Sequence, residues 1–497
     1  MTQYDPEPLI PGVSPMRRGT FIVGLLALTA FAATLRLFRL AEPSFWVDEL
    51  YLVLHIAREP GIDYWLRPLA YLPTTFGLWL QQVDIGALSP TAVHEWRALG
   101  ITEWSLRLPS AIIGVLSVLV LGYMSQRLVD RRTALLFTAL LAVATWHLWV
   151  SQTARFYAQQ ILIYNVCLIL YYDGVTRRSP RTLVTCGVFF VLAFMTQMTS
   201  PMLLGVFAVE SAIRRWRNRT GRPGLAGGLL IAAALFVCGG IVWWWYIISD
   251  FRATGQPAAV LIGGTVWLVG LPVAVCAAGT AVWLWRRDPR LAGFLVASAI
   301  VPVAALVVLG WLGAIVHTRY ASPAMYGWLM LAAIGLSVAY NLLRPHVGNL
   351  LAATPALVVI AACLFSDLVY YTGGYGYRAR WREAIAHIDQ HRHPDQPIYA
   401  DFIPHYQLRY YLGTNENIVL IPFDFTRDDL ADDDQPYWLL LRNSSPVGNP
   451  RAGQHPPGVD LKAHFSHRNF QPYHSVHVYR SRAASPEPTR RADGSGD

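Results

Sequence analysis

Long apolar runs constrain the fold of this chain more than any other feature. They recur between residues 20 and 371, and many reach the roughly 20 residues that a membrane-spanning helix needs. Only 14% of all residues are charged and 54% are hydrophobic, whereas ordinary soluble domains carry about 25% charged residues. The sequence therefore predicts an α-helical polytopic membrane protein.

The apolar runs predict roughly eleven transmembrane helices. They lie near residues 20–40, 107–127, 133–150, 156–173, 182–197, 200–213, 225–248, 259–285, 291–313, 321–343 and 349–371. The number is least certain around residues 182–213, because the two runs there are short.

Arginine clusters in alternate loops predict the orientation of these spans. With a cytoplasmic N-terminus, every inside loop is arginine-rich, as the positive-inside rule requires. These loops contain Arg127, Arg131 and Arg132; Arg177, Arg178 and Arg181; Arg214, Arg215, Arg217, Arg219 and Arg222; Arg286, Arg287 and Arg290; and Arg344. The formal charge of +9 is therefore read as a topology signal, and no nucleic-acid partner is expected. A single lysine among many arginines suggests a GC-rich bacterial genome, so the expected location is the bacterial inner membrane.

Composition divides the chain into four parts. A cytoplasmic segment, 1–19, precedes the transmembrane domain, 20–371, whose first outer loop, 41–106, contains two runs typical of interfacial helices. Residues 372–482 have soluble composition, with a helix expected in WREAIAHIDQHR and strands in QPIYADF, ENIVLIPF, PYWLLLR and HSVHVYR, which predicts a small extracytoplasmic α/β domain. The tail, 483–497, is expected to be disordered.

Two adjacent acids stand out in the stretch SFWVDELYLVLHIAR after the first span. Asp48 and Glu49 could simply favour a helix N-terminus, where the helix dipole stabilises negative charge. A carboxylate beside a bilayer is costly, however, unless it is paired or functional. The alternative interpretation is a general base that acts on a membrane-borne substrate.

Basic and aromatic residues mark the outer starts of two spans. SQTARFYAQQ contains Arg155 and Tyr157, and HTRYASPAMYGWLML contains His317, Arg319 and Tyr320. They could be interfacial residues with their charges in water, or they could bind an anion such as a lipid phosphate. Arg67, beside a proline that restricts the backbone, is a third phosphate-binding candidate.

Other polar residues and the cysteines carry weaker signals. Arg378, Arg380 and Arg382 are interpreted as a solvated stripe or as a further phosphate contact. His387 and His391 have metal-compatible spacing but lack a convincing third ligand, so no metal site is predicted. The five cysteines fall within apolar runs, far apart in sequence, and are expected to be packing residues rather than a disulfide framework.

The order of these motifs resembles that of the GT-C membrane glycosyltransferases. It is most similar to the glycosyltransferase family 39 branch, which includes the protein O-mannosyltransferases, and to the aminoarabinose transferase of lipid A. The motifs are the aromatic-Asp-Glu segment, Arg67-Pro68-Leu69, SLRLPSAIIGVLSVLVLGYMSQRL, SQTARFYAQQILI, HTRYASPAMYGWLMLAA and RARWREAIAHI. The resemblance covers roughly residues 20–400 and implies a GT-C fold.

The resemblance also implies roles for the site residues. Asp48 matches the general base and Glu49 the acid commonly beside it. Arg67 matches a position that faces the donor phosphate, Arg155 and Tyr157 match a boundary motif of the family, and His317, Arg319 and Tyr320 match its later outer-loop motif. All six are expected to bind the donor phosphate. The implied reaction is inverting transfer of a sugar from a polyprenyl-phosphate carrier to an acceptor hydroxyl of a lipid, glycan or protein. The implied partners are this donor, the acceptor and membrane lipids.

Some questions stay open at this stage. No cofactor is identified, and metal dependence is undecided because Thr153 stands where many relatives have Glu. A multi-pass transporter or flippase is the rival class, although transporters usually place ionisable residues near the membrane centre in two related halves. A non-catalytic GT-C relative is the other alternative.

Overall fold

The computed structural model describes residues 16–57, 67–218, 257–312, 316–373, 378–414, 417–421, 436–442, 459–465 and 476–481. The chain divides into two compact units. The helical unit comprises Met1–Leu40, Pro60–Gly77 and Arg107–Val369, and the mixed unit comprises Ala41–Glu59, Leu78–Leu106 and Tyr370–Asp497. This division differs from the one expected, because segments 41–59 and 78–106 of the first loop cluster with the C-terminal region.

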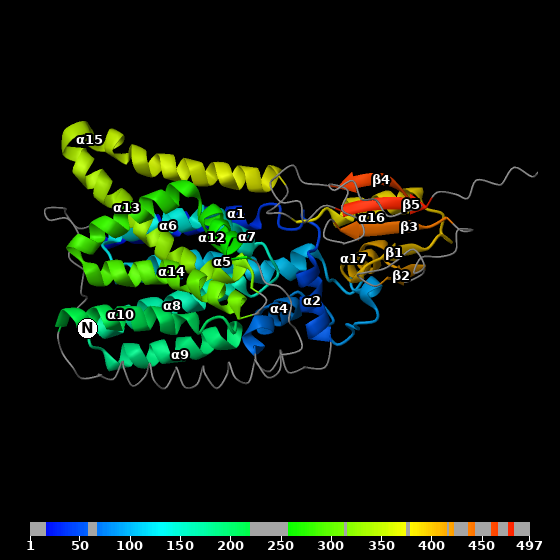
Figure 1. The fold of residues 1–497 in the computed structure, drawn as a ribbon, viewed down its shortest axis with the longest axis horizontal. Coiled ribbons are helices and arrows are strands. Elements are labelled where there is room, and N and C mark those ends of the chain that lie inside the picture. The colour runs from blue at the N-terminus through cyan, green and yellow to red at the C-terminus, as the bar shows by residue number, and fades with distance from the viewer. Residues whose placement is uncertain are drawn as a thin grey trace, which may run out of the picture. The chain divides into compact units, whose positions relative to one another are not determined.

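The described part of the helical unit is built from helices, which Figure 1 labels. They are α1 (Arg18–Leu37), α4 (Pro68–Leu80), α5 (Glu103–Ser125), α6 (Arg131–Ala142), α7 (Thr145–Ser151), α8 (Tyr157–Thr176), α9 (Pro180–Thr196), α10 (Met202–Asn218), α12 (Ala258–Val269), α13 (Leu271–Arg287), α14 (Pro289–Trp311), η2 (Thr318–Ala324) and α15 (Met325–Thr372). The first residues of α5 and the last residues of α4 and α15 belong to the mixed unit.

Side-chain caps begin three of these helices. Asp130 accepts hydrogen bonds from the backbone N–H groups at the start of α6, Ser179 does so for α9, and Asp288 does so for α14. Such caps satisfy N–H groups that have no partner inside the helix. All three lie in arginine-rich loops, so the sequence ends one helix and begins the next at the points where positive charge is concentrated.

Among the described residues, four helical segments are long and apolar enough to cross a membrane. They are α1, α5, α14 and the joined segment of η2 and α15. The number rises to six if α6 with α7 and α12 with α13, bent by 59° and 97°, each form one span. The run predicted at 225–248 lies outside the described residues, so the count of about eleven stays a prediction.

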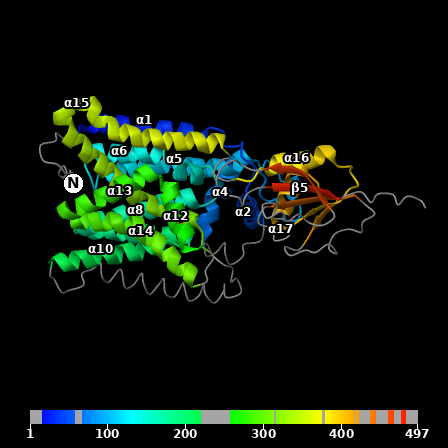
Figure 2. The ribbon, with the colours of Figure 1, turned by 45° about the horizontal axis from the view of Figure 1, so that its top comes forward.

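Bends occur within two long helical segments. The run 259–285, predicted as one span, is instead α12 and α13, with Gly270 at φ 92° between them and a proline in the first turn of α13. Gly348 interrupts α15 at φ 79°, between the predicted spans 321–343 and 349–371, and Figures 1 and 2 show the two arms meeting at a bend. Glycine tolerates positive φ because it has no Cβ.

The mixed unit combines first-loop helices with a small sheet. Its helical elements are α2 (Val47–Ala57), η1 (Val93–Glu95), α16 (Trp381–His391) and α17 (Phe402–Leu412). The strands are β1 (Ile398–Ala400), β2 (Ile418–Leu420), β3 (Trp438–Arg442), β4 (Val459–Phe465) and β5 (Val476–Ser481), in the order β2-β1-β3-β5-β4. β1 pairs in parallel with β2 and β3, whereas β5 pairs antiparallel with β3 and β4.

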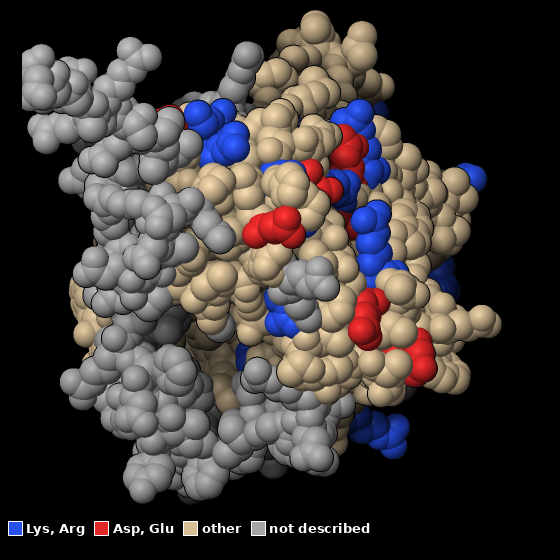
Figure 3. Space-filling model, turned by 90° about the vertical axis from the view of Figure 1, so that its right-hand side faces the viewer, with Lys and Arg blue, Asp and Glu red and all other residues tan. Residues whose placement is uncertain are grey.

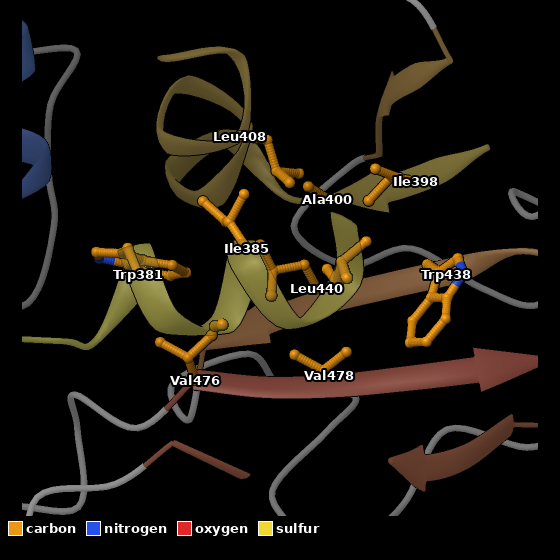
Figure 4. Packing of buried hydrophobic residues seen from close by; sticks show 11 residues of the cluster. Trp381, Ile385, Ile398, Ala400, Leu408, Trp438, Leu440, Val476 and Val478 are labelled. Carbon is orange, nitrogen blue, oxygen red and sulfur yellow. The ribbon is translucent and has the colours of Figure 1, made fainter. Parts of the chain in front are cut away.

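An apolar core joins α16 and α17 to one face of this sheet (Figure 4). Trp381, Ile385 and Ile388 recur on α16 at helical spacing and are buried there. Leu440 on β3 and Val478 on β5 belong to the same core. Because strand side chains alternate between faces, their neighbours form a second buried cluster, which comprises Tyr399, Ile421, Tyr437, Leu439, Leu441, Val459 and Tyr479.

Candidate active site

The six predicted phosphate-binding residues are linked by ring contacts in the helical unit. We call them, together with Phe156, the arginine–aromatic group; its members are Arg67, Arg155, Phe156, Tyr157, His317, Arg319 and Tyr320. Phe156 lies at its centre. The guanidinium carbons of Arg67 and Arg155 lie 5.6 and 5.2 Å from the centroid of the Phe156 ring, a distance at which the ring quadrupole attracts a cation.

A second set of contacts continues from Phe156 to η2. The rings of Phe156 and Tyr157 are 4.7 Å apart, and those of Tyr157 and Tyr320 are 6.2 Å apart. The Arg319 guanidinium lies 5.5 Å from the Tyr320 ring, and the His317 ring lies 5.7 Å from it. Segments that are far apart in sequence thus supply a single group of basic and aromatic side chains.

Helix starts fix the position of this group. Phe156 is the N-cap of α8 and His317 is the N-cap of η2. The N-terminus of a helix as long as α8 carries partial positive charge and favours an anion. Arg155 and Arg319 are half-buried, whereas Tyr157 is buried. The arrangement can therefore neutralise an anionic ligand with charge and with a hydroxyl donor.

Hydrogen bonds from neighbouring helices hold the backbone around Arg155. The buried amide of Gln152 donates to the carbonyl oxygens of Arg36 and Phe38 at the end of α1, at 3.1 and 2.9 Å. Arg36 in turn donates to the carbonyl of Ala142 at the end of α6, at 3.0 Å. Ser110 of α5 donates to the carbonyl of Arg155 itself, at 3.3 Å. Hydrogen bonds from several helices thus hold the backbone at and near Arg155 in place.

Arg67 makes a further polar contact within the helical unit. Its Nη1 donates to Oε1 of Gln197, at 3.0 Å, and Gln197 is the C-cap of α9. A neutral glutamine does not cancel the charge of an arginine, as an acidic partner would.

The two predicted acids lie in the mixed unit, in the first turn of α2. Asp48 is partly exposed, whereas Glu49 is 0% exposed. Glu49 Oε2 accepts a hydrogen bond from the backbone N–H of Trp46, at 3.0 Å, as a glutamate in the third helical position does in a capping box. Its other oxygen lies 4.0 Å from Nη1 of Arg378, which is also buried. The neighbouring acids therefore have different surroundings.

The arginines after the last predicted span are not all solvated. Arg378 is buried beside Glu49, so the solvated interpretation is wrong for this residue, because a carboxylate distant in sequence is brought to it. Arg380 and Arg382 are 41% and 42% exposed at their side chains, and they form ion pairs with Glu383 and Glu103. On the molecular face in Figure 3, basic and acidic side chains likewise lie close together.

Metal-ligating side chains are dispersed in the part of the chain that the structure describes. Within it, no group of three or more His, Cys, Asp or Glu residues could hold a metal ion. The rings of His387 and His391 are 4.3 Å apart, but the two form only a pair. Cys167 and Cys186 are free thiols whose sulfurs lie 3.6 Å apart between α8 and α9, closer than their sequence separation suggested.

Sequence reasoning missed the residues that connect the predicted ones. Phe156 lies in the motif SQTARFYAQQ. Its position between an arginine and a tyrosine was the sequence feature that could have identified it. Glu103 is a single acid just before an apolar run, and Tyr411 is one of many tyrosines, so neither carried a local signal.

Comparisons with known proteins agree with this architecture. The family model for Dolichyl-phosphate-mannose-protein mannosyltransferase matches residues 97–245, which include Arg155 and Tyr157. The structure is similar to that of ArnT from Cupriavidus metallidurans bound to undecaprenyl phosphate, with a TM-score of 0.52 and 14% identity over 94% of this chain and 99% of that chain. The chain has a GT-C glycosyltransferase fold.

Two further solved structures are also similar to this chain. The apo state of the same ArnT gives a TM-score of 0.50 at 14% identity, over 94% of this chain and 99% of that chain. The Archaeoglobus fulgidus oligosaccharyltransferase tethered with an acceptor peptide gives 0.48 at 13% identity, over 93% and 76%. No curated protein sequence matches the chain. The GT-C resemblance inferred from the order of motifs is confirmed.

Proposed function

We propose that this GT-C protein is an inverting glycosyltransferase that uses a polyprenyl-phosphate sugar as its donor. The observation that carries the proposal is the arginine–aromatic group, in which three arginines from separate segments share contacts around Phe156 and Tyr320. A leaving lipid phosphate needs positive charge that is already in place when the glycosidic bond breaks. The ArnT structure with undecaprenyl phosphate supports this choice of ligand.

The reaction assigns different tasks to the two sets of residues. Asp48 takes the proton of the acceptor hydroxyl while that oxygen bonds to the anomeric carbon. The bond between the anomeric carbon and the phosphate oxygen breaks, and polyprenyl phosphate leaves with the electron pair. Arg67, Arg155 and Arg319 neutralise the phosphate, with Tyr157, His317 and Tyr320 as further donors or packing partners. Attack opposite the leaving group inverts the anomeric configuration.

Topology gives the proposed location of this chemistry. The alternating arginine-rich loops place the N-terminus in the cytoplasm and the motifs on the extracytoplasmic side of a bacterial inner membrane. The transmembrane part would hold the lipid tail of the donor, and residues 372–482 would lie outside the membrane. The acceptor is a hydroxyl of a lipid, glycan or protein.

Release of polyprenyl phosphate from a panel of polyprenyl-phosphate sugars tests the proposal. The protein in nanodiscs, with extracted native membranes as the acceptor source, should release polyprenyl phosphate from at least one donor. Asp48→Asn should lower the rate by about 10²–10⁴-fold, the usual contribution of a general base, while binding of polyprenyl phosphate persists. Full activity of the folded Asp48→Asn protein would disprove the assignment of the base. Absence of release from every donor would instead favour a transporter or a non-catalytic relative.

A further inference from the structure

The start of the first loop is tied to α16 within the mixed unit. The backbone N–H of Arg382 donates to Oγ of Ser44, at 3.1 Å, and its guanidinium donates to the carbonyl oxygens of Ala41 and Glu42, at 3.3 and 3.4 Å. The same guanidinium donates to Oε1 of Glu103. One arginine thus binds the backbone before α2 and an acid at the start of α5.

Tyr411 on α17 completes this connection. Its hydroxyl donates to Oε1 of Glu103 at 2.7 Å and accepts a hydrogen bond from the backbone N–H of Phe45 at 2.7 Å. Burial and then the nearby Glu103 carboxylate raise the pKa of Tyr411 well above its usual value. The hydroxyl therefore remains protonated at neutral pH and keeps donating to Glu103.

The first turn of α2 has its own contact with the C-terminal region. Glu49 and Arg378 approach to 4.0 Å and are 0% and 4% exposed at their side chains. Removing one partner from such a pair would leave a buried charge uncompensated, which is costly. Glu49 also accepts a hydrogen bond from the backbone N–H of Trp46. The Glu49–Arg378 pair and this hydrogen bond therefore fix the residues on either side of Asp48.

We propose that Arg378, Arg382 and Tyr411 are positioning residues that hold α2, and with it Asp48, in the orientation that catalysis requires. The inference rests on the proposed function, in which Asp48 is the base. In this assignment Glu49 is the anchor of α2 rather than a second catalytic acid. A displacement of about 1 Å at a reacting group can cost about 10²-fold in rate, so a base in a loop needs such a scaffold.

Arg382→Met tests the proposal, with Arg392→Met as the matched control. Arg392 is the C-cap at the other end of α16 and pairs with Asp389 of that helix at 3.7 Å, whereas Arg382 contacts the first loop. We expect Arg382→Met to lower kcat for sugar transfer at least about tenfold, with the KM for the donor changed less than about twofold. Arg382→Lys, which keeps the charge but not the planar fork, should restore only part of kcat.

Hydrogen exchange provides a measurement that does not depend on activity. Amides of residues 47–57 should exchange faster in Arg382→Met than in the wild type, whereas those of α8 should not change. Tyr411→Phe, which removes only a hydroxyl, should give the same pattern with a smaller effect and covers the case that Arg382→Met does not fold.

The outcomes separate the inference from the proposed function. A wild-type protein that releases polyprenyl phosphate from no donor would refute the function and the positioning role together. A wild type that depends on Asp48, with Arg382→Met and Tyr411→Phe as active as Arg392→Met and α2 exchange unchanged, would refute the positioning role alone. A rise in donor KM with kcat unchanged would also refute it, because the loss would then lie in donor binding.

Discussion

Two sets of arginines, one in each unit of this protein, have different surroundings. In the helical unit, Arg67, Arg155 and Arg319 each lie over an aromatic ring. In the mixed unit, Arg378 and Arg382 each face a carboxylate, and Arg382 also lies over the ring of Tyr411. An aromatic ring attracts an arginine without neutralising it, whereas a carboxylate largely cancels its charge. Under the proposed function, the first set serves binding, and under the further inference the second set serves structure.

Arg155→Met should give the largest effect of the binding set. Loss of a charged hydrogen-bonding group at the phosphate of the sugar donor should lower kcat/KM for that donor about 10–100-fold, the range for hydrogen bonds to charged groups. Donor-dependent release of polyprenyl phosphate measures it. Arg287→Met is the control, since Arg287 also lies over a ring, Trp283, at 5.9 Å, but in an expected cytoplasmic loop. Equal losses of kcat/KM in both variants would show that the effect of Arg155 is not specific to the arginine–aromatic group.

Gly327→Ala should reduce the stability of the helical unit. An added Cβ would lie 2.6 Å from the backbone N of Ala299 and from the carbonyl O of Leu295, so α15 would have to move away from α14. We expect a loss of about 1–3 kcal/mol, seen as a lower unfolding temperature in detergent. Gly263→Ala, where nothing lies within 4 Å, should cause no such loss; a similar loss there would show that helix packing is not the cause.

Phe156→Leu should sharpen the comparison by removing the ring shared by two arginines. Since an exposed to partly buried cation–π contact contributes about 0.5–2 kcal/mol, donor KM should rise about twofold to thirtyfold. Phe38→Leu is the control, because Arg39 lies over Phe38 at 5.4 Å and Phe38 is outside the arginine–aromatic group. An unchanged donor KM in Phe156→Leu would show that the ring does not organise the arginines.

Acid should weaken the mixed unit slightly through His405. Burial, and then the charge of Arg409, lower the pKa of His405 below its ordinary value of 6.5. The unfolded chain therefore binds more protons between the two pKa values, so this contribution to stability is complete above pH 6.5 and is lost as the pH falls through the folded value. His405→Gln should show a smaller decrease in unfolding temperature between pH 7 and pH 5. The same decrease as in the wild type would assign it to other groups.

Local patterns in the sequence predicted many elements but not their partners. The helical spacing of Trp381, Ile385 and Ile388 predicted α16, and the stretch ELYLVLHIAR predicted α2. The strand β4 was missed, although Val459 to Phe465 alternates between apolar and polar residues, because a charged strand at the edge of a sheet resembles a loop. The bend at Gly270 depends on a single residue inside an apolar run, whereas Gly348 lies between two predicted runs.

The sequence by itself determined the class of protein and the identity of the candidate residues. Run length and loop charge are local properties of single segments. The order of the motifs can be read along the chain without knowing how its elements pack. Only the tertiary structure decided that Phe156 joins Arg67 to Arg155, and that Glu49 and Glu103 face Arg378 and Arg382. Glu103 and Arg382 are 279 residues apart. Such contacts arise from the packing of whole elements, so no local pattern of residues can specify them.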